Sequence, residues 1–255
     1  MDISTRVNEL IQKGKTFCLA TVTTSASADI AAGQKAIVLD PGKLEGELGD
    51  GQLGQTVKAL ALEAISKKKG GLVEIKPGVQ VFFDIISPEL KLIVCGAGHI
   101  AIPLARFARD MGFQVTVLDD RDDFAQPARF PGCDVIAAEF AVSLRELSLN
   151  HATFVVVITR GHEHDADCLM EILKKETAYV GLIGSRRRVR FVLETLEKQG
   201  IAKERLSQVF TPIGTPIGAE SPAEIALSIV AELVCVHRKG FQQARALRAA
   251  VGIDP

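Results

Sequence analysis

The sequence has no long hydrophobic run and almost no net charge, and each of these absences argues against a class of protein. No stretch of 18 or more apolar residues occurs, so we expect no membrane-spanning helix. The formal net charge of −1 argues against a general binder of nucleic acid or of a membrane surface. Residues 1–15 are amphipathic and do not resemble a signal peptide, so we expect a cytoplasmic protein.

Motifs for disulfides and for two common kinds of catalysis are also missing. The five cysteines are odd in number and none forms a CxxC pair, which favours reduced thiols, most of them buried. Neither a nucleophile elbow with serine, acid and histidine in order nor a P-loop occurs. The sequence therefore supports neither acyl transfer nor kinase chemistry.

The chain is organised around residues 90–120. A short apolar run at 91–95 predicts a buried strand, and residues 96–101 follow it with the pattern GxGxxG/A. Apolar residues then recur at helical spacing as far as residue 111, and residues 113–118 predict a second strand. Asp119 follows about twenty residues after the glycines, as in a dinucleotide-binding unit. We therefore predict a Rossmann unit here.

Each residue of the predicted turn has a physical role. Gly96 permits a tight turn, and Gly98 lets backbone N–H groups approach a phosphate closely. The helix should begin close to His99, because Pro103 is tolerated only in a first turn. Its free N–H groups and positive dipole end would then attract an anion. Gly96, Gly98, His99 and Ile100 are the predicted phosphate-binding residues.

The acid after the second strand predicts how a ribose would be held. Asp119 is placed to accept hydrogen bonds from ribose hydroxyls, which favours NAD over NADP. Arg121 lies two residues later and complicates that preference, since a nearby arginine accommodates a 2′-phosphate. Both residues are candidate cofactor-binding residues.

The 255 residues suffice for one large or two smaller domains. Residues 1–87 predict a small α+β domain that includes a hairpin at 72–86, and Ser87-Pro88 is the expected boundary. Residues 88–255 alternate strands and helices, with a sixth strand predicted at 208–211. The predicted fold class is α/β, a Rossmann-like parallel sheet domain preceded by a small α+β domain.

In an open parallel sheet, ligands bind beyond the carboxyl ends of the strands, where the strand order reverses. Segments 96–99, 159–165, 184–190 and 212–218 are predicted at that edge. The first and fourth strands should be neighbours, which would let His99 face His162 or His164.

Residues 162–165, HEHD, have side chains of the kinds that bind metals. An HxH spacing at the start of a helix does not place both histidines on one face, so a metal site would need ligands from elsewhere. Two other interpretations stay open, namely capping of the helix and contact with an anion. We predict no metal site, and we count His162, His164 and Asp165 as candidate cofactor-binding residues.

Residues 184–190 predict a second helix N-terminus after a glycine, here with four arginines. Free N–H groups and guanidinium groups together suit phosphate oxygens, which makes Gly184, Ser185 and Arg186 candidates for anion binding. The alternative is a solvated helix face, and we interpret Arg187 and Arg190 in that way.

Four blocks, at residues 96–125, 159–173, 179–200 and 212–233, together resemble the xanthine dehydrogenase accessory factor family, XdhC/CoxI. The resemblance implies an accessory protein that binds molybdenum cofactor (molybdopterin) and protects it. It further implies delivery of the sulfurated cofactor to an apo xanthine dehydrogenase-type molybdoenzyme, with a cysteine desulfurase as a second partner. The first half resembles the family's N-terminal domain more loosely, and Gln52 stands where the family has a cysteine in a glycine-rich segment.

Three functions remain open from the sequence. The leading hypothesis is a non-catalytic molybdenum-cofactor chaperone that holds phosphates at residues 96–99 and 185–186. The second is an NAD(P)-dependent oxidoreductase, with His99 or His162 transferring a proton. The third is a nucleotide-sensing regulatory module. We expect a homodimer, which is the commonest assembly of soluble proteins.

Overall fold

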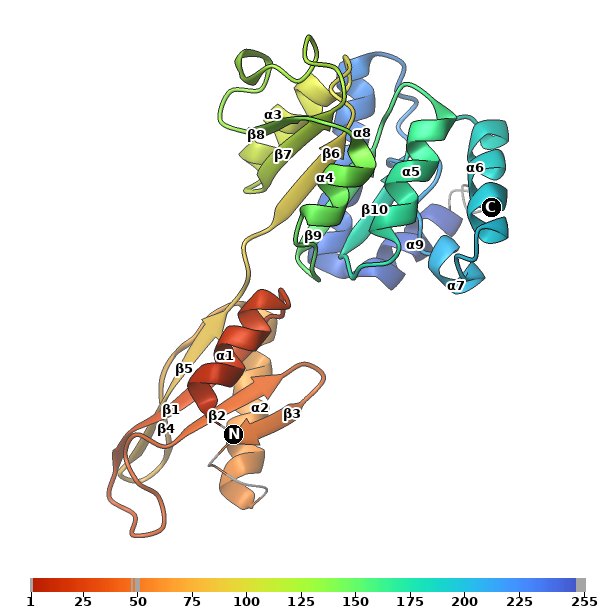
Figure 1. The fold of residues 1–255 in the computed structure, drawn as a ribbon. Helices are drawn as coiled ribbons and strands as arrows, with labels where there is room; N and C mark the ends of the chain where they lie inside the picture. The colour runs from red at the N-terminus through yellow and green to blue at the C-terminus, as the bar shows by residue number, and fades with distance from the viewer. Residues whose placement is uncertain (1, 47, 49–50, 251–255) are drawn as a thin grey trace. The chain divides into compact units, whose positions relative to one another are not determined.

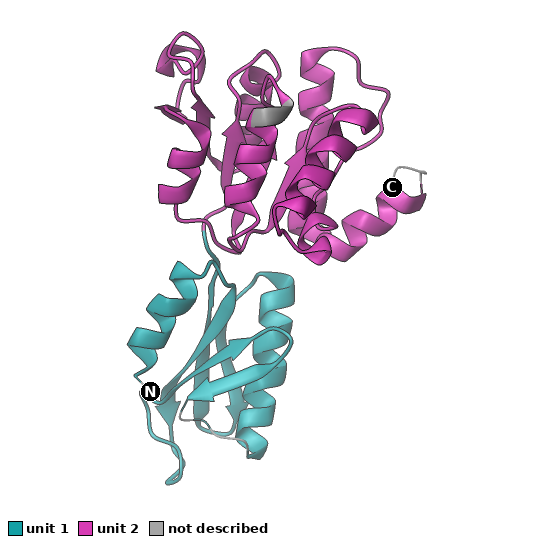
Figure 2. Cartoon of the chain, turned by 45° about the vertical axis from the view of Figure 1, so that its right-hand side comes forward, with its two compact units in different colours: residues 1–88 teal, residues 89–255 magenta. Residues whose placement is uncertain are grey.

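The computed structural model describes residues 2–46, 48 and 51–250, with the side chains of residues 162 and 163 outside that description. The chain divides into two compact units, Met1–Pro88 and Glu89–Pro255, called unit 1 and unit 2 below (Figure 2). Within the described residues, no helix is both long and apolar enough to cross a membrane. All five cysteines are free; three are buried and two are half-buried.

Unit 1 is an antiparallel sheet of order β3-β2-β1-β5-β4 with two helices (Figure 1). The strands are β1 Phe17–Ser25, β2 Lys35–Leu39, β3 Lys43–Gly46, β4 Gly71–Lys76 and β5 Val79–Ile86. The helices are α1 Ile3–Gln12 and α2 Gln52–Lys67. The predicted hairpin is confirmed as β4 and β5, which pair in antiparallel register around Pro77-Gly78.

Both faces of this sheet are covered because side chains alternate along each strand. Phe17 packs in one apolar cluster with Leu10 of α1, and Cys18 packs in another with Val57 of α2. Asp2 caps α1 by accepting hydrogen bonds from the N–H groups of residues 4 and 5. Helix α2 begins at Gln52, and residues 49 and 50 of the glycine-rich segment before it lie outside the described residues.

Unit 2 is a parallel sheet of order β10-β9-β6-β7-β8 (Figure 1). The strands are β6 Lys91–Cys95, β7 Gln114–Asp119, β8 Asp134–Ala137, β9 Thr153–Val157 and β10 Tyr179–Leu182. Read from β8 to β10 and numbered within unit 2, the strand order is third, second, first, fourth, fifth. This is the order of a dinucleotide-binding sheet. The predicted α/β class with a Rossmann-like sheet is confirmed, and the order reverses between β6 and β9.

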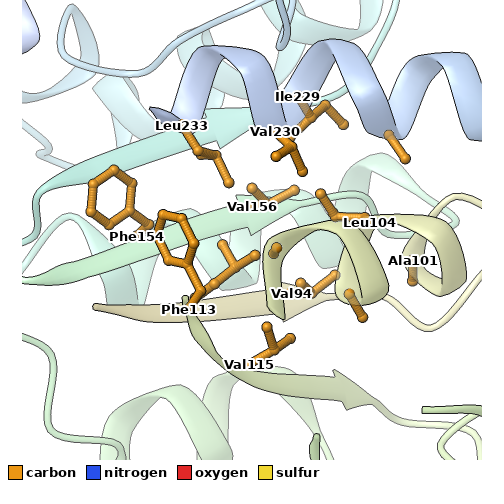
Figure 3. Packing of buried hydrophobic residues seen from close by; sticks show 14 of the residues in the cluster. Val94, Ala101, Leu104, Phe113, Val115, Phe154, Val156, Ile229, Val230 and Leu233 are labelled. Carbon is orange, nitrogen blue, oxygen red and sulfur yellow. The ribbon is translucent and has the colours of Figure 1, made fainter. Parts of the chain in front are cut away.

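Helices cover both faces of the parallel sheet, so its central strands are mostly apolar. Leu92 and Val94 pack in the cluster that contains Leu104 and Ile229, and Figure 3 shows Val94, Leu104 and Ile229 in this layer. Ile93 and Cys95 pack in the cluster on the opposite face. The helices are α3 Ala101–Asp110, α4 Phe140–Glu146, α5 His162–Ile172, α6 Arg186–Lys198, α7 Lys203–Leu206, α8 Pro222–Lys239 and α9 Phe241–Ala250, with a short 3₁₀ turn η1 at Pro127–Arg129.

The predicted sixth strand at residues 208–211 is wrong. Only Phe210 pairs with the sheet, as a parallel bridge to Gly181. The N–H groups of Gln208 and Val209 instead donate to the carbonyls of Arg205 and Leu206 at 3.1 Å, closing the turn after α7. These backbone donors are therefore unavailable to the sheet, although the apolar composition of the run is typical of a strand.

Candidate ligand-binding site at the carboxyl edge of the parallel sheet

The turn between β6 and α3 lies against the backbone of the β9–α5 loop. Gly96 has a φ of 114°, and a Cβ placed there would lie 2.5 Å from the carbonyl oxygen of Ile158. Its N–H donates to the carbonyl of Leu118 at 2.7 Å. Glycine is therefore required at this position, both for its backbone conformation and for space. The predicted adjacency of the segments after β6 and β9 is confirmed.

Gly98 faces open space, in contrast to Gly96. A Cβ built at Gly98 would meet no atom within 4 Å. Helix α3 then begins at Ala101, two residues beyond the predicted start at His99, with Pro103 in its first turn as expected. Its N-cap, Ile100, offers no side-chain hydrogen bond to the first N–H groups. In the first turn of α3 the Ala101 N–H donates to the Gly98 carbonyl at 3.1 Å and Pro103 has no N–H. The helix end thus presents the Ile102 N–H and a positive partial charge beside an open glycine.

The carboxylate of Asp119 is already hydrogen-bonded within the protein. Oδ2 accepts from the Ala97 N–H at 2.7 Å and from Arg121 Nη2 at 2.9 Å, and Oδ1 accepts from Arg121 Nε at 2.8 Å and from its N–H at 3.1 Å. Burial alone would raise the pKa of Asp119, but the bonds from Arg121 and Ala97 outweigh it and hold the pKa below its usual value. The predicted ribose contact would have to share this carboxylate.

Arg121 is fixed on both sides of its guanidinium group. Besides the Asp119 carboxylate it contacts the ring of Phe124, whose centroid lies 3.6 Å from Arg121 Cζ. Arg129 approaches the same ring at 5.1 Å. Cation–π contact of this kind restrains the guanidinium group at the end of β7.

A largely buried polar link joins Thr159 in the loop after β9, Asp165 in the first turns of α5 and Arg188 in the first turn of α6. Thr159 Oγ1 donates to Asp165 Oδ1 at 2.6 Å, and Arg188 Nε donates to Asp165 Oδ2 at 2.7 Å. Arg188 Nη2 also donates to the carbonyl of Thr159 at 3.2 Å. Burial raises the pKa of Asp165, and the bonds from Thr159 and Arg188 offset this only in part. Asp165 therefore joins the β9–α5 loop to the start of α6.

The histidines of the HEHD segment are placed only in part. The side chain of His162 lies outside the described residues, so the predicted approach of His99 and His162 stays a prediction. His164 is half-buried, with its ring centroid 5.6 Å from that of Phe140. In the part of the chain that the structure describes, no three His, Cys, Asp or Glu side chains gather as a metal site requires.

The second predicted anion site lies at the start of α6. Gly184 has a φ of 155°, and Ser185 caps the helix by accepting from the Arg188 N–H at 3.3 Å. Arg186 and Arg187 are exposed, which confirms the solvated position predicted for Arg187. The serine oxygen thus already satisfies one of the helix's free N–H groups.

A hollow of about 250 Å³ lies beside this helix start and includes Arg186 in its lining. The rest of the lining comes from residues 212–219 and from Ile225 and Ser228 of α8. Ile217 is exposed at this loop, so the hollow combines an apolar rim with one guanidinium group. Such a mixture suits a ring that carries polar substituents.

A buried ion pair between helices α8 and α9 anchors the loop of residues 212–219. Arg248 Nη1 pairs with Glu232 Oε2, and Nη2 donates to the carbonyl of Pro212 at 2.7 Å. Glu232 Oε1 accepts from the Gly214 N–H at 3.1 Å and from the Tyr179 hydroxyl at 2.5 Å. Pro212 and Gly214 in the lining of the hollow are therefore held in place by buried side chains.

Three side-chain contacts at this edge were not predicted from the sequence. Arg160, in the loop after β9, forms a bidentate ion pair with Asp120, which follows β7. The other two are the contacts that Thr159 and Arg188 make with Asp165. The available signal was that Thr159, Arg160 and Arg188 lie in segments predicted at this edge, but the partners of Arg160 and Arg188 lie 40 and 23 residues away along the chain.

Two family models match the chain. The model of the XdhC Rossmann domain matches residues 92–233, which is more than half of the chain. The model of the XdhC and CoxI family matches residues 10–76. The two matches fall in unit 2 and unit 1 respectively.

The chain is also similar in sequence to individual curated proteins. The chain is 27% identical over 252 residues to an uncharacterized protein of Escherichia coli K12, YqeB, covering 92% of this chain and 46% of that protein. It is 33% identical over 160 residues to a Bacillus subtilis 168 protein described as a probable xanthine dehydrogenase subunit, covering 62% of this chain and 46% of that protein. The chain thus spans about half the length of these curated relatives.

A solved structure described as a xanthine dehydrogenase from Bacillus halodurans is also similar. It superposes with a TM-score of 0.61 at 28% identity, covering 98% of this chain and 70% of that one. Sequence and fold therefore agree, and the extent of the Rossmann-domain match decides the assignment. The chain belongs to the XdhC and CoxI family.

Proposed function

We propose that this chain is an accessory protein for a xanthine dehydrogenase-type molybdenum hydroxylase, and that it carries molybdenum cofactor as cargo without transforming it. Family membership supports the accessory role. The proposal includes two partners, an apo-hydroxylase that receives the cofactor and a cysteine desulfurase that provides sulfur. It also includes a homodimeric assembly, which light scattering of the purified chain would test.

One observation carries the binding part of the proposal. Helix α3 begins at Ala101 without a side-chain cap, three residues after Gly98, where a Cβ would meet nothing within 4 Å. This position lies where the strand order reverses, between β6 and β9. Backbone donors, a positive helix end and open space together suit a phosphate group, which molybdenum cofactor carries.

The region around the start of α6 supports a ligand larger than a phosphate. Arg186 and the hollow of about 250 Å³ beside it offer a charged group and space at the same edge of the sheet. A ligand that combines a ring system with phosphates fits this pairing better than a free anion does.

Unit 1 offers no thiolate for molybdenum. Its single cysteine is Cys18, which is fully buried, and burial raises the pKa of its thiol to about 12. Gln52 occupies the start of α2, where the family resemblance leads one to expect a cysteine nearby. We therefore assign cofactor binding to the backbone and side chains of unit 2.

Titration of the purified chain with molybdenum cofactor released from a purified hydroxylase tests the proposal. Gly98→Asp puts a carboxylate into the open space without a steric clash, so binding should be lost while the fold is kept. Gly51→Asp is the matched control, because a Cβ there also meets nothing within 4 Å and lies in unit 1. Equal retention of the cofactor by wild type and Gly98→Asp would contradict the proposed site.

The strand order of unit 2 favours a second candidate. An order of third, second, first, fourth, fifth is that of NAD(P)-binding sheets, so an NAD(P)-dependent oxidoreductase is the alternative, with the exposed His99 as its proton-transfer group. Titration with NAD⁺ and NADP⁺ in parallel separates the candidates. Tight binding without turnover would favour a nucleotide-sensing module.

A further inference from the structure

The Arg160–Asp120 ion pair connects the two strands that flank the β6–α3 turn. Asp120 directly follows β7, Arg160 lies three residues after β9, and β6 runs between those strands. Arg160 Nη2 donates to Asp120 Oδ2 at 2.7 Å, while Nη1 pairs with Oδ1. Because neighbouring strands lie about 4.8 Å apart, the pair spans roughly 10 Å across the end of β6.

Both ends of this pair adjoin residues that contact the turn itself. Asp119, next to Asp120, accepts the Ala97 N–H at 2.7 Å. Ile158, two residues before Arg160, has its carbonyl oxygen 2.5 Å from the Cβ position of Gly96. The pair therefore crosses the glycine turn on which a phosphate would rest.

Arg160 differs from Arg121 and Arg188, which also form ion pairs at this edge, in how exposed its partner is. The partners of Arg121 and Arg188 are the carboxylates of Asp119 and Asp165, which are 1% and 0% exposed. Arg160 is 41% exposed and its partner Asp120 is 22% exposed. Since a partly exposed ion pair contributes little to stability, Arg160 is the arginine that changes partner most easily.

We propose that Arg160 is a ligand-binding residue that Asp120 holds in position: when the phosphate-bearing ligand binds at the Gly96–His99 turn, the Arg160 guanidinium group exchanges the Asp120 carboxylate for a phosphate of that ligand. The inference rests on the proposed function. A guanidinium fork matches phosphate oxygens as well as it matches a carboxylate, and phosphate carries more charge. Asp120 then acts as an internal competitor that sets the affinity of the site.

The ligand, and not pH, drives this exchange. Hydrogen bonding from Arg160 lowers the pKa of Asp120 to about 2, so the carboxylate stays ionised at neutral pH. His164 also acts on Asp120, and Asp119 acts on Arg160, through longer-range charge interactions. A competing anion is therefore what frees Arg160.

Dissociation constants of four proteins test the exchange, measured calorimetrically with released molybdenum cofactor and, separately, with NAD⁺. Arg160→Ala should weaken binding by at least about tenfold, because a charged hydrogen-bond donor to phosphate is lost. Asp120→Asn should tighten binding several-fold, because the competitor loses its charge. Arg187→Ala, which removes an exposed arginine of α6, should match wild type.

The opposite signs distinguish the exchange from other roles of the pair. Equal weakening by Arg160→Ala and Asp120→Asn would assign the pair a structural role and overturn the proposal. Tighter binding by both variants would mean that the pair only blocks the ligand, which would also overturn the proposal. If neither variant changes the affinity while Gly98→Asp still abolishes it, the exchange is wrong and the proposed function stands. A wild-type protein that binds neither titrant would overturn both.

Discussion

Alanine at Gly96 and alanine at Gly98 should have very different consequences, although the two glycines are only two residues apart. At Gly96 the new Cβ would lie 2.5 Å from the Ile158 carbonyl oxygen and 2.9 Å from its carbonyl carbon, with φ at 114°. At Gly98 the new Cβ would meet nothing within 4 Å. One substitution forces the β6–α3 turn away from β9, and the other leaves the turn in place.

The expected magnitudes follow from these contacts. A non-glycine residue in a backbone region reserved for glycine costs roughly 1–3 kcal/mol. Overpacking against a backbone that cannot move freely costs roughly 1–3 kcal/mol more. Gly96→Ala should therefore lower the free energy of unfolding by roughly 2–6 kcal/mol, a large part of the 5–15 kcal/mol typical of a domain. Gly98→Ala should change it by about +0.4 to +1 kcal/mol, because alanine restricts the unfolded chain.

The chain provides its own reporter for this measurement. It has no tryptophan and one tyrosine, Tyr179, which is buried in unit 2. Tyrosine fluorescence during urea unfolding therefore follows unit 2 alone. With a denaturant slope of about 1–3 kcal/mol per M, a loss of about 4 kcal/mol lowers the midpoint by roughly 1.3–4 M. Equal midpoints for Gly96→Ala and Gly98→Ala would refute the argument from the close approach to Ile158.

Three further results are expected. Arg248→Met should lower the free energy of unfolding by about 3–5 kcal/mol in the same urea assay, because it leaves the Glu232 carboxylate buried without a compensating charge. A loss below about 1 kcal/mol would show that the pair is not buried in solution. Arg160 depresses the folded pKa of Asp120 to about 2, so Asp120→Asn should lower the free energy of unfolding to its full extent only above the usual carboxyl pKa of 3.8, and the difference from wild type should fade as pH falls from 3.8 to 2. Thermal melts across that range measure this difference, and a difference that stayed constant would contradict the assignment. Cys18 should resist alkylation by iodoacetamide at pH 8 in the folded protein and react in urea, since burial raises its thiol pKa to about 12. Mass spectrometry of the labelled peptides measures the reaction, and labelling of Cys18 in the folded protein would contradict the prediction.

Local patterns in the sequence were sufficient for most of the fold. Strand β6, the glycine turn, helix α3 and β7 follow from an apolar run, two glycines, helical spacing and a terminal acid, all within 31 residues. These signals act over a few residues, because turn geometry and helix periodicity are local properties. The same logic failed at residues 208–211, where α7 turns back on the chain and its carbonyls take the N–H groups that a strand would have used.

The sequence by itself determined most of the elements, the family and the position of the phosphate-suited turn. Only the tertiary structure decided which charged groups at that turn are already engaged. Asp119 is bound by Ala97, 22 residues earlier, Asp120 by Arg160, 40 residues later, and Asp165 by Arg188, 23 residues later. Each of these pairs joins segments that meet because the parallel strands end at one edge. The choice of partner among several nearby charges depends on distances that no local pattern encodes.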